Sequence, residues 1–552
     1  MKNEGEDEPA INRIFSLYYE GNDPPFSNAA EFAKLNCERA DCRHYPVIMK
    51  ARLCENGLQH SSCGTKGGSC QLKISESAEE SDTLTKSYKP GRTAFVLMGG
   101  LMFRKLRGLL FVLAVVLTSF VSIHAYEAIR GVTGLLKYDA AKALQGYTLI
   151  PPLEGTTTYL IDMEGYIVHT WPSKYSPGMH ALLLESGNLL RAARLPDSPV
   201  MFGGAGGLIQ EIDWDGNVVW EYKNHSSNSV QHHTFSRMPG GNTLVLCWEK
   251  KTREEAIAKG RKPDTIKENG IWPDYVQEVN RDGKVVWEWH VWDHLGTGPD
   301  QFNINFVLPS KTGVMAAADW THFNVVEYIP ESDQIILNSR NFGETYLVNH
   351  KTGAVEFRWG NPCASGQGKC PSFVDDGDQQ LFGPHSVTRL ENGNLLIFDN
   401  GWQRPEGNRS RVVELDPKNK VIVWQYAPRS AGSLYSAYQG STQRLANGNT
   451  LVTSSISGHI VEVAGGARPQ VVWEFVLPLG RGGASCFAED GTGSIHRAYR
   501  YGSDYPAFKG KDLSQRRPFK LGCLELWRWS EPQSKQEPQA PQNPPAPPEP
   551  KQ

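Results

Sequence analysis

The sequence lacks a strong excess of either charge. Its 57 Lys and Arg residues stand against 60 Asp and Glu residues, a formal net charge of −3 over 552 residues. Proteins that bind nucleic acid or an anionic membrane surface by electrostatic attraction carry a basic excess. We therefore expect no nucleic-acid partner and no attraction of the folded domain to a charged membrane surface.

Long apolar runs are also scarce. The clearest one, 109–123, follows a basic segment at 104–107 and precedes small residues, which is the order of an export signal. As a helix it would rise only about 22 Å at roughly 1.5 Å per residue, short of the roughly 30 Å hydrocarbon core of a bilayer. We predict a signal peptide at 102–128 and a periplasmic or secreted protein. The alternative is an uncleaved anchor at 108–125, through which the chain would contact the membrane.

The N-terminal cysteines lack the spacing of a typical zinc site. Five of the ten cysteines lie in the first seventy residues, and no two of these five are spaced as CxxC. The stretch 1–101 has no lasting periodicity and precedes the predicted export signal. We interpret it as disordered, or as a misassigned extension of a protein that begins at Met102; a small zinc module is the alternative. The Pro-rich end, 531–552, is predicted to be a disordered tail.

Helical segments are missing between the repeats that fill 130–530. One pattern, a turn residue followed by β-branched residues and an aromatic pair around a polar residue, returns six times, at 165–171, 216–222, 283–289, 353–359, 420–426 and 469–475. Hairpin turns containing Asn-Gly or Gly-Gly, each followed by an apolar strand, lie between these copies. The sequence therefore predicts an all-β fold, a six-bladed β-propeller closed by strands around 523–529. A large β-sandwich or a solenoid is the alternative.

Polar residues recur at matching places in these repeats. His233 lies eight residues before Gly241 of the next hairpin turn, and His385 lies eight residues before Gly393 of its own. His322 precedes the corresponding strand of the unit between them. Arg340 follows that strand, whereas His180 is out of step by one residue. Matching positions in different blades lie at similar radius and height about a propeller axis. We therefore expect these side chains to meet in one central pocket, although a single histidine in a strand is more often a packing residue.

Three histidines and an arginine predict the chemistry of an anion. Three imidazoles form a catalytic zinc set in some enzymes. A neighbouring guanidinium disfavours a dication, but it matches the oxygens of sulfate or phosphate. A neutral imidazole is also a competent covalent nucleophile near pH 7. The set therefore predicts transfer of an anionic group with neither a metal nor a cofactor.

Two stretches resemble signature segments of bacterial arylsulfotransferases. They are DWTHFNVVEYIPESDQIILNSRNFGE at 319–344 and FGPHSVTRLENGNLLIFDNG at 382–401, and TGLLKYDAAKALQGYTLI at 133–150 is similar to the start of these proteins. The resemblance covers roughly 130–530 and implies a six-bladed propeller. It also implies that sulfate moves from a phenolic ester to a phenol through a sulfohistidine, without a nucleotide donor.

The same resemblance implies roles for the four site residues. The His of FGPHSV, here His385, would be the nucleophile. The His of DWTHFN and the Arg of NSRN, here His322 and Arg340, would hold the sulfate oxygens. The HHTF segment supplies the remaining histidine, and the turn spacing selects His233 over His232, which alternates to the opposite face of the strand. The expected partners are a phenolic sulfate donor and a phenolic acceptor.

Two other functions remain open at this level. The first is a non-catalytic propeller that binds glycans or partner proteins. The second is a metal-dependent hydrolase or lactonase that uses the histidines. Fold alone does not decide between them; transfer from an aryl sulfate to a phenol excludes the first, and indifference to chelators excludes the second.

Export would place the remaining cysteines in an oxidising compartment. Cys363 with Cys370, and Cys486 with Cys523, are then expected to form disulfides. Cys247 lies within a strand and is expected to be a free buried thiol. The alternative is that all five are buried thiols.

Overall fold

The computed structural model describes residues 132–519 apart from 267–269, 308–317, 373, 431, 467, 481–482 and 485–492. The signal or anchor at 102–128, the stretch 1–101 and the tail 531–552 lie outside these residues, and so do Cys486 and Cys523. In the described part of the chain, no helix has the length and apolar character needed to span a bilayer.

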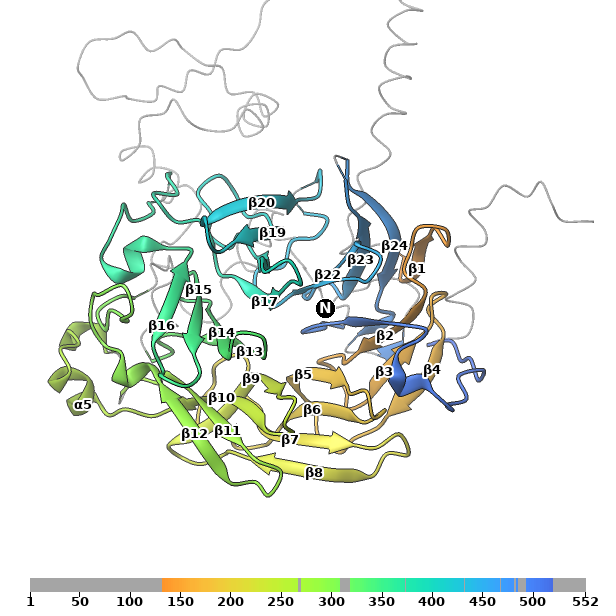
Figure 1. Ribbon diagram of the computed structural model, residues 1–552, viewed down its shortest axis with the longest axis horizontal. Helices are drawn as coiled ribbons and strands as arrows, with labels where there is room; N and C mark the ends of the chain where they lie inside the picture. The colour runs from red at the N-terminus through yellow and green to blue at the C-terminus, as the bar shows by residue number, and fades with distance from the viewer. Residues whose placement is uncertain are drawn as a thin grey trace, which may run out of the picture. The chain divides into compact units, whose positions relative to one another are not determined.

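The described residues form six antiparallel sheets arranged around a central axis, which confirms the six-bladed propeller (Figure 1). From the axis outward, the first blade contains β27 (Tyr499–Gly502), β2 (Gly146–Ile150), β3 (Thr158–Ile161) and β4 (Ile167–Trp171). The second contains β5 (Pro177–Leu183), β6 (Leu189–Arg194), β7 (Gly207–Ile212) and β8 (Val218–Lys223). The third contains β9 (Ser229–Arg237), β10 (Thr243–Glu249), β11 (Asp274–Val279) and β12 (Val285–His290).

The other three blades follow the same order. The fourth contains β13 (Phe323–Ile329), β14 (Gln334–Ser339), β15 (Glu344–Asn349) and β16 (Val355–Trp359). The fifth contains β17 (His385–Arg389), β18 (Leu395–Asp399), β19 (Arg411–Asp416) and β20 (Val421–Tyr426). The sixth contains β21 (Ser441–Arg444), β22 (Thr450–Ser454), β23 (His459–Ala464), β24 (Gln470–Val476) and, outermost, β1 (Gly134–Tyr138).

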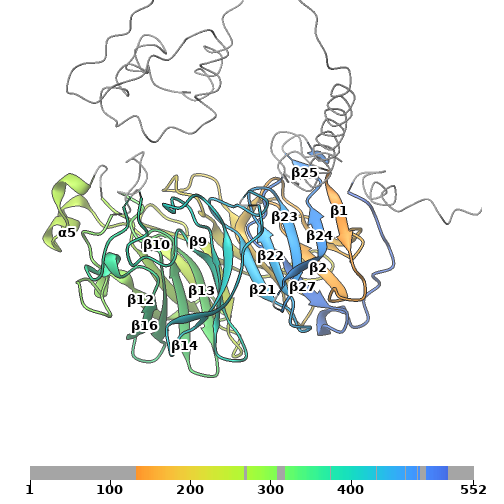
Figure 2. The ribbon, with the colours of Figure 1, turned by 90° about the horizontal axis from the view of Figure 1, so that it is seen from above.

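Short elements occupy some of the connections. The helix α5 (Arg253–Ala258) lies between β10 and β11, at the periphery of the third blade in both ribbon views (Figure 2). A two-stranded ribbon, β25 (Leu479–Gly480) and β26 (Gly483–Ala484), follows the sixth blade. Four 3-10 turns complete the described elements: η3 (Pro263–Thr265), η4 (Val291–Asp293), η5 (Pro362–Ser365) and η6 (Pro506–Phe508).

The aromatic pattern that returns six times in the sequence forms the fourth strand of each sheet, β4, β8, β12, β16, β20 and β24. Its tryptophans fasten neighbouring blades together. The indole N–H groups donate across to backbone carbonyls of the next blade, Trp171 to Asp213, Trp220 to Arg281, Trp289 to Gly353 and Trp473 to Met163, at 2.7–3.1 Å. A buried indole needs such an acceptor, so the repeated aromatic residue supplies both apolar area and a fixed angle between blades.

Both ends of the described chain take part in closing the ring. β27 pairs with β2 as the innermost strand of the first blade, with Gly146 opposite Gly502. β1 pairs with β24 at the outer edge of the sixth blade, with Gly134 opposite Val476. The strand expected to close the ring, 523–529, lies outside the described residues, and the closing strand that the structure does describe comes earlier in the chain.

The described cysteines have the predicted states. Cys363 and Cys370, in the connection between β16 and β17, form a disulfide with their Cα atoms 4.9 Å apart. Cys247, in β10, is a free and buried thiol. The connection that holds the disulfide leads directly to His385, the first residue of β17.

Candidate active site

The four residues predicted from the repeats lie in one cluster near the axis. The ring centroids of His233 and His322 are 4.9 Å apart. The backbone N–H of Arg340 donates to the carbonyl of His322 at 3.0 Å. His385 is 1% exposed, and burial, followed by the positive charges of Arg340 and His322, lowers its pKa well below the ordinary histidine value. Three consecutive blades thus supply one site.

Irregular strand pairing aims these side chains. The pairing register of β9, β13 and β17 shifts beside the histidines. His233 and His322 have φ angles of +46° and +47°, and Ser386, next to His385, has +51°. A non-glycine residue in this left-handed region carries strain of roughly 1–3 kcal/mol, and bulges of this kind re-aim side chains next to active sites. The strain therefore lies where the candidate chemistry is.

The hydrogen bonds of His385 fix which ring nitrogen is basic. Its Nε2 accepts from the backbone N–H of Gln439 at 3.1 Å, so Nε2 holds the lone pair. Its Nδ1 lies 2.8 Å from Asn400 Oδ1 and 3.0 Å from the carbonyl oxygen of Gly383, so Nδ1 donates. The amide of Asn400 is itself oriented, because its Nδ2 donates to the carbonyls of Ser436 and Gln439 at 2.8 and 2.7 Å. His385 is therefore a neutral imidazole with a basic Nε2.

His322 is paired with a carboxylate. Its Nδ1 lies 2.5 Å from Asp319 Oδ2, and both side chains are largely buried. Asp319 is held in turn by Asn341, whose Nδ2 donates to the Asp319 backbone carbonyl at 2.8 Å. A carboxylate at Nδ1 stabilises the positive charge that forms when Nε2 takes up a proton. The pair is therefore suited to proton transfer.

His233 is oriented by the histidine beside it. His232 Nδ1 and His233 Nδ1 are 2.8 Å apart, and His232 Nε2 lies 3.0 Å from Asp274 Oδ1. The ring of His232 stacks on Trp248 with centroids 3.7 Å apart. Burial and then the charge of His322 lower the pKa of His233 well below its ordinary value. The spacing argument that selected His233 is consistent with this arrangement, in which His232 serves as its support.

Arg340 supplies positive charge beside His385. Its guanidinium lies over the ring of Trp402, 4.7 Å from the ring centroid, and Nη1 donates to Asn341 Oδ1 at 3.0 Å. The positive charge of Arg340 also acts on the phenol of Tyr435, whose pKa burial raises. Two half-buried aromatic side chains, Trp402 and Tyr435, therefore border the site next to its cation. No sequence pattern indicated these two residues, because they lie in connections outside the repeated pattern.

Two further buried histidines lie near the cluster: His180, which the spacing placed out of step by one residue, and His496, which the spacing missed. His180, in β5, has the predicted one-residue offset and packs against Phe235 with centroids 4.7 Å apart. His496 precedes β27, and its ring centroid is 6.0 Å from that of His233. β27 pairs with β2, which comes much earlier in the chain, so no hairpin turn joins the two strands. The spacing to a following turn, which was used for the other histidines, therefore cannot be measured for His496.

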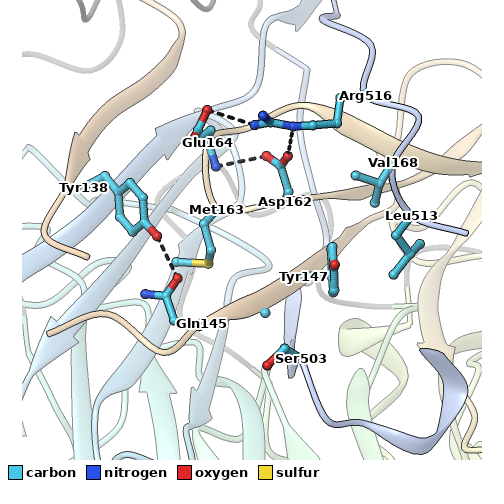
Figure 3. A pocket seen from close by; sticks show the side chains of 11 residues that line it. Tyr138, Gln145, Tyr147, Asp162, Met163, Glu164, Val168, Ser503, Leu513 and Arg516 are labelled. Carbon is cyan, nitrogen blue, oxygen red and sulfur yellow. Dashed lines mark hydrogen bonds and ion pairs between the residues drawn. The ribbon is translucent and has the colours of Figure 1, made fainter. Parts of the chain in front are cut away.

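A separate hollow of about 350 Å³ opens in the first blade. Arg516 crosses it to Asp162 and Glu164 at 2.6 and 2.8 Å, so the charged groups drawn there are paired (Figure 3). Gly146 lines this hollow and pairs with Gly502, the last residue of β27. His496 of the histidine cluster precedes Tyr499, the first residue of β27. The hollow is therefore at the opposite end of the blade from the site.

Within the described residues, no three His, Cys, Asp or Glu side chains are placed to share a metal ion. The histidines of the cluster instead have their Nδ1 atoms engaged by an amide, a carboxylate or another histidine. The guanidinium of Arg340 beside His385 disfavours a metal cation and is suited to an anion.

Comparisons with solved structures give matches of low similarity. The chain aligns with a protein of unknown function from Bacteroides caccae at 13% identity and a TM-score of 0.39, over 60% of this chain and 94% of that one. It aligns with virginiamycin B lyase from Staphylococcus aureus at 11% identity and a TM-score of 0.34, over 62% of this chain and 84% of that one. It aligns with the periplasmic gluconolactonase of Pseudomonas aeruginosa at 11% identity and a TM-score of 0.37, over 65% of this chain and 99% of that one. Similarity at this level carries no argument about function.

The family comparison is more specific. No curated protein matches the chain. The family model for arylsulfotransferase (ASST) matches residues 144–472, more than half of the chain. The matched stretch contains all four predicted site residues and runs from the first blade to the sixth. This chain belongs to the arylsulfotransferase (ASST) family, and it is a sulfotransferase.

Proposed function

We propose that the chain moves a sulfuryl group from an aryl sulfate to a phenol through a covalent sulfohistidine at His385, with no nucleotide donor. Family membership supports an aryl sulfate donor and a phenolic acceptor. The observation that carries the covalent step is the hydrogen bonding of His385, which leaves Nε2 unprotonated beside the guanidinium of Arg340. A neutral imidazole next to a fixed positive charge is suited to attack an anionic ester.

In the first half-reaction, His385 Nε2 attacks the sulfur and the sulfur–oxygen bond to the aryl group breaks. The approaching sulfur replaces the N–H of Gln439, which occupies the Nε2 lone pair in the structure. The departing oxygen keeps the bonding electrons and takes a proton from Nε2 of protonated His322, whose charge Asp319 balances. Arg340 stabilises the sulfuryl oxygens, and His233 donates a hydrogen bond within the site. The product is a phenol and sulfated His385.

In the second half-reaction, a phenol takes the place of the first one. The neutral Nε2 of His322 removes its proton, and the phenolic oxygen attacks the sulfur. The sulfur–nitrogen bond breaks and its electrons return to Nε2 of His385. His322 is again protonated and His385 is again neutral, so the cycle is closed without a cofactor. General acid–base help of this kind contributes typically 10²–10⁴-fold in rate.

The test is mass spectrometry of the His385 peptide after brief exposure to an aryl sulfate with no nucleotide present. We expect one sulfuryl group on that peptide and its loss when a phenol is added. The His385→Ala variant should lose transfer by about 10⁴-fold or more, because the nucleophile is absent. Chelators should leave the wild-type rate unchanged. If the His385→Ala variant still formed a sulfated intermediate and transferred normally, this result would falsify the covalent role of His385.

We further propose that the protein is exported. The pattern at 102–128 supports this. So does the Cys363–Cys370 disulfide, because disulfides persist in oxidising compartments. N-terminal sequencing of natively produced protein should find a start shortly after 125 if the signal is cleaved, or at 102 if it is retained as an anchor. A start near Asn3 contradicts the view that synthesis begins at Met102.

A further inference from the structure

Five of the six blades place a histidine within the innermost strand or just before it. His180, His233, His322 and His385 come from the second to the fifth blades, and His496 comes from the first. In the sixth blade Gln439 takes this place, and its backbone N–H contacts His385. The family match ends at residue 472, so His496 lies outside the matched stretch. Neither the repeats nor the family comparison assigns it a role.

The imidazole of His496 is buried without hydrogen bonds. It is 0% exposed, and within the described residues neither ring nitrogen has a hydrogen-bond partner. A buried donor or acceptor that is left unsatisfied destabilises the fold, so such groups call for an explanation such as a ligand. Other cluster histidines differ: His385 and His322 have both a buried environment and partners at Nδ1. His496 is thus a buried polar side chain beside the cluster whose two ring nitrogens lack hydrogen-bond partners within the described residues.

The position of His496 complements that of Arg340. The first and fourth blades face each other across a six-bladed ring, and Arg340 belongs to the fourth. The ring of His496 is 6.0 Å from that of His233, and burial, followed by the positive charge of Arg497, lowers its pKa well below the ordinary value. A tetrahedral anion held by Arg340 on one side presents its other oxygens to the opposite side. A neutral imidazole offers one N–H to such an oxygen.

We propose that His496 is a substrate-binding residue, which donates a hydrogen bond to a sulfuryl oxygen on the side of the pocket opposite Arg340. This role rests on the proposed sulfotransfer and extends the site from three blades to the blade that closes the ring. It also gives a reason for an unpaired imidazole in the interior, because the missing partner arrives with each substrate.

The test uses two substitutions and a matched control. His496→Phe removes the donor and keeps an aromatic ring of similar shape, and His496→Gln keeps an N–H donor. The control is His169→Phe. His169 lies in β4, the outermost strand of the same blade, and its buried Nε2 also has no recorded hydrogen-bond partner within the described residues. Three inter-strand steps of about 4.8 Å separate β4 from the innermost strand.

Transfer from an aryl sulfate to a phenol is measured first. We expect His496→Phe to lower kcat/KM by roughly 10²–10³-fold, as removal of one preorganised donor does elsewhere, and His496→Gln to recover at least part of it. His169→Phe should transfer normally. Thermal unfolding separates this from a packing role: replacing an unsatisfied imidazole by an apolar ring should leave the melting temperature of His496→Phe unchanged or higher.

Binding of labelled inorganic sulfate, by equilibrium dialysis at constant ionic strength, tests the anion contact without catalysis. Loss of binding in His496→Phe but not in His169→Phe supports the proposal, even if the wild type transfers nothing, in which case the proposed function alone fails. Normal transfer by His496→Phe, equal sulfate binding by both variants, or a wild type that neither binds sulfate nor transfers overturns the role of His496.

Discussion

At the scale of single residues, the site depends on which nitrogen of each imidazole is free. His385 has its Nδ1 held by Asn400 and Gly383, and His322 has its Nδ1 held by Asp319. Each pairing leaves Nε2 as the nitrogen that the proposed reaction uses, although Nε2 of His385 accepts from the backbone N–H of Gln439 in the structure. Burial lowers the pKa of His385 well below the ordinary value, whereas His322 has a carboxylate as its partner. Under the proposed mechanism, His385 is therefore the nucleophile and His322 carries the proton.

This division predicts how Asp319→Asn behaves. The asparagine cannot balance a proton on His322, so transfer should fall by roughly 10²–10⁴-fold for substrates whose leaving oxygen needs that proton. The loss should be smaller with a nitrophenyl sulfate, whose phenolate leaves unaided, than with unsubstituted phenyl sulfate. Pre-steady-state release of the phenol measures the first half-reaction for both esters.

A matched control for this variant exists in the same blade. Asp333 contacts Nδ1 of His350 at 2.9 Å, but the pair lies outside the cluster. Asp333→Asn should leave transfer close to normal with both esters. An Asp319→Asn variant that loses the same factor with both leaving groups would count against proton donation by His322.

At the scale of elements, bulged innermost strands and close glycines set the direction of the histidines. The backbone N–H of His233 donates to the carbonyl of Gly204, in the connection between β6 and β7. Gly204 has a φ of +104°, and a Cβ atom there would lie 2.0 Å from Cε1 of His233. Only glycine fits at this position without moving the ring.

Gly204→Ala is therefore expected to displace His233 and reduce transfer by about 10²-fold, the effect of a misplacement of about 1 Å in an active site. The neighbouring Gly203 is the control, because a Cβ atom there meets nothing within 4 Å. Gly203→Ala should transfer normally. Steady-state rates, with circular dichroism to check folding, measure the difference; equal rates in the two variants would show that the position of His233 is unimportant.

At the scale of the whole molecule, four buried histidines make the fold sensitive to acid. Burial lowers the pKa values of His180, His233, His385 and His496 well below the ordinary value. Below about pH 6.5 these histidines are protonated in the unfolded chain but stay neutral in the native state. Burial raises the pKa of Glu327 to about 7, which acts in the opposite direction and offsets one histidine as the pH falls from 7.

The free energy of unfolding should consequently fall as the pH is lowered from 7 to about 5, with each neutral histidine contributing about 1.4 kcal/mol per pH unit. His496→Phe removes one such group, so its stability should depend less steeply on pH by about that amount. Urea unfolding at several pH values measures both slopes. A stability that is flat over this range contradicts the assignment of neutral histidines to the interior.

The local pattern of the sequence was sufficient for the fold class, because each blade is built from contacts close in sequence. Hairpin turns, strand alternation and the aromatic fourth strand repeat at short range, and the structure confirms them in β4, β8, β12, β16, β20 and β24. The same short-range spacing predicted that His233, His322, His385 and Arg340 would meet, and the structure brings them together. The disulfide between Cys363 and Cys370 was expected because of the predicted export signal.

Only the tertiary structure decided how the ring closes and what closing it adds to the site. β27 pairs with β2, whose residues lie more than three hundred positions earlier, so no local pattern announces the contact. That pairing brings His496 to the cluster. The partners that settle proton positions, Asn400 for His385 and Asp319 for His322, likewise depend on how loops pack, since a hydrogen bond requires a geometry that spacing along the chain does not fix.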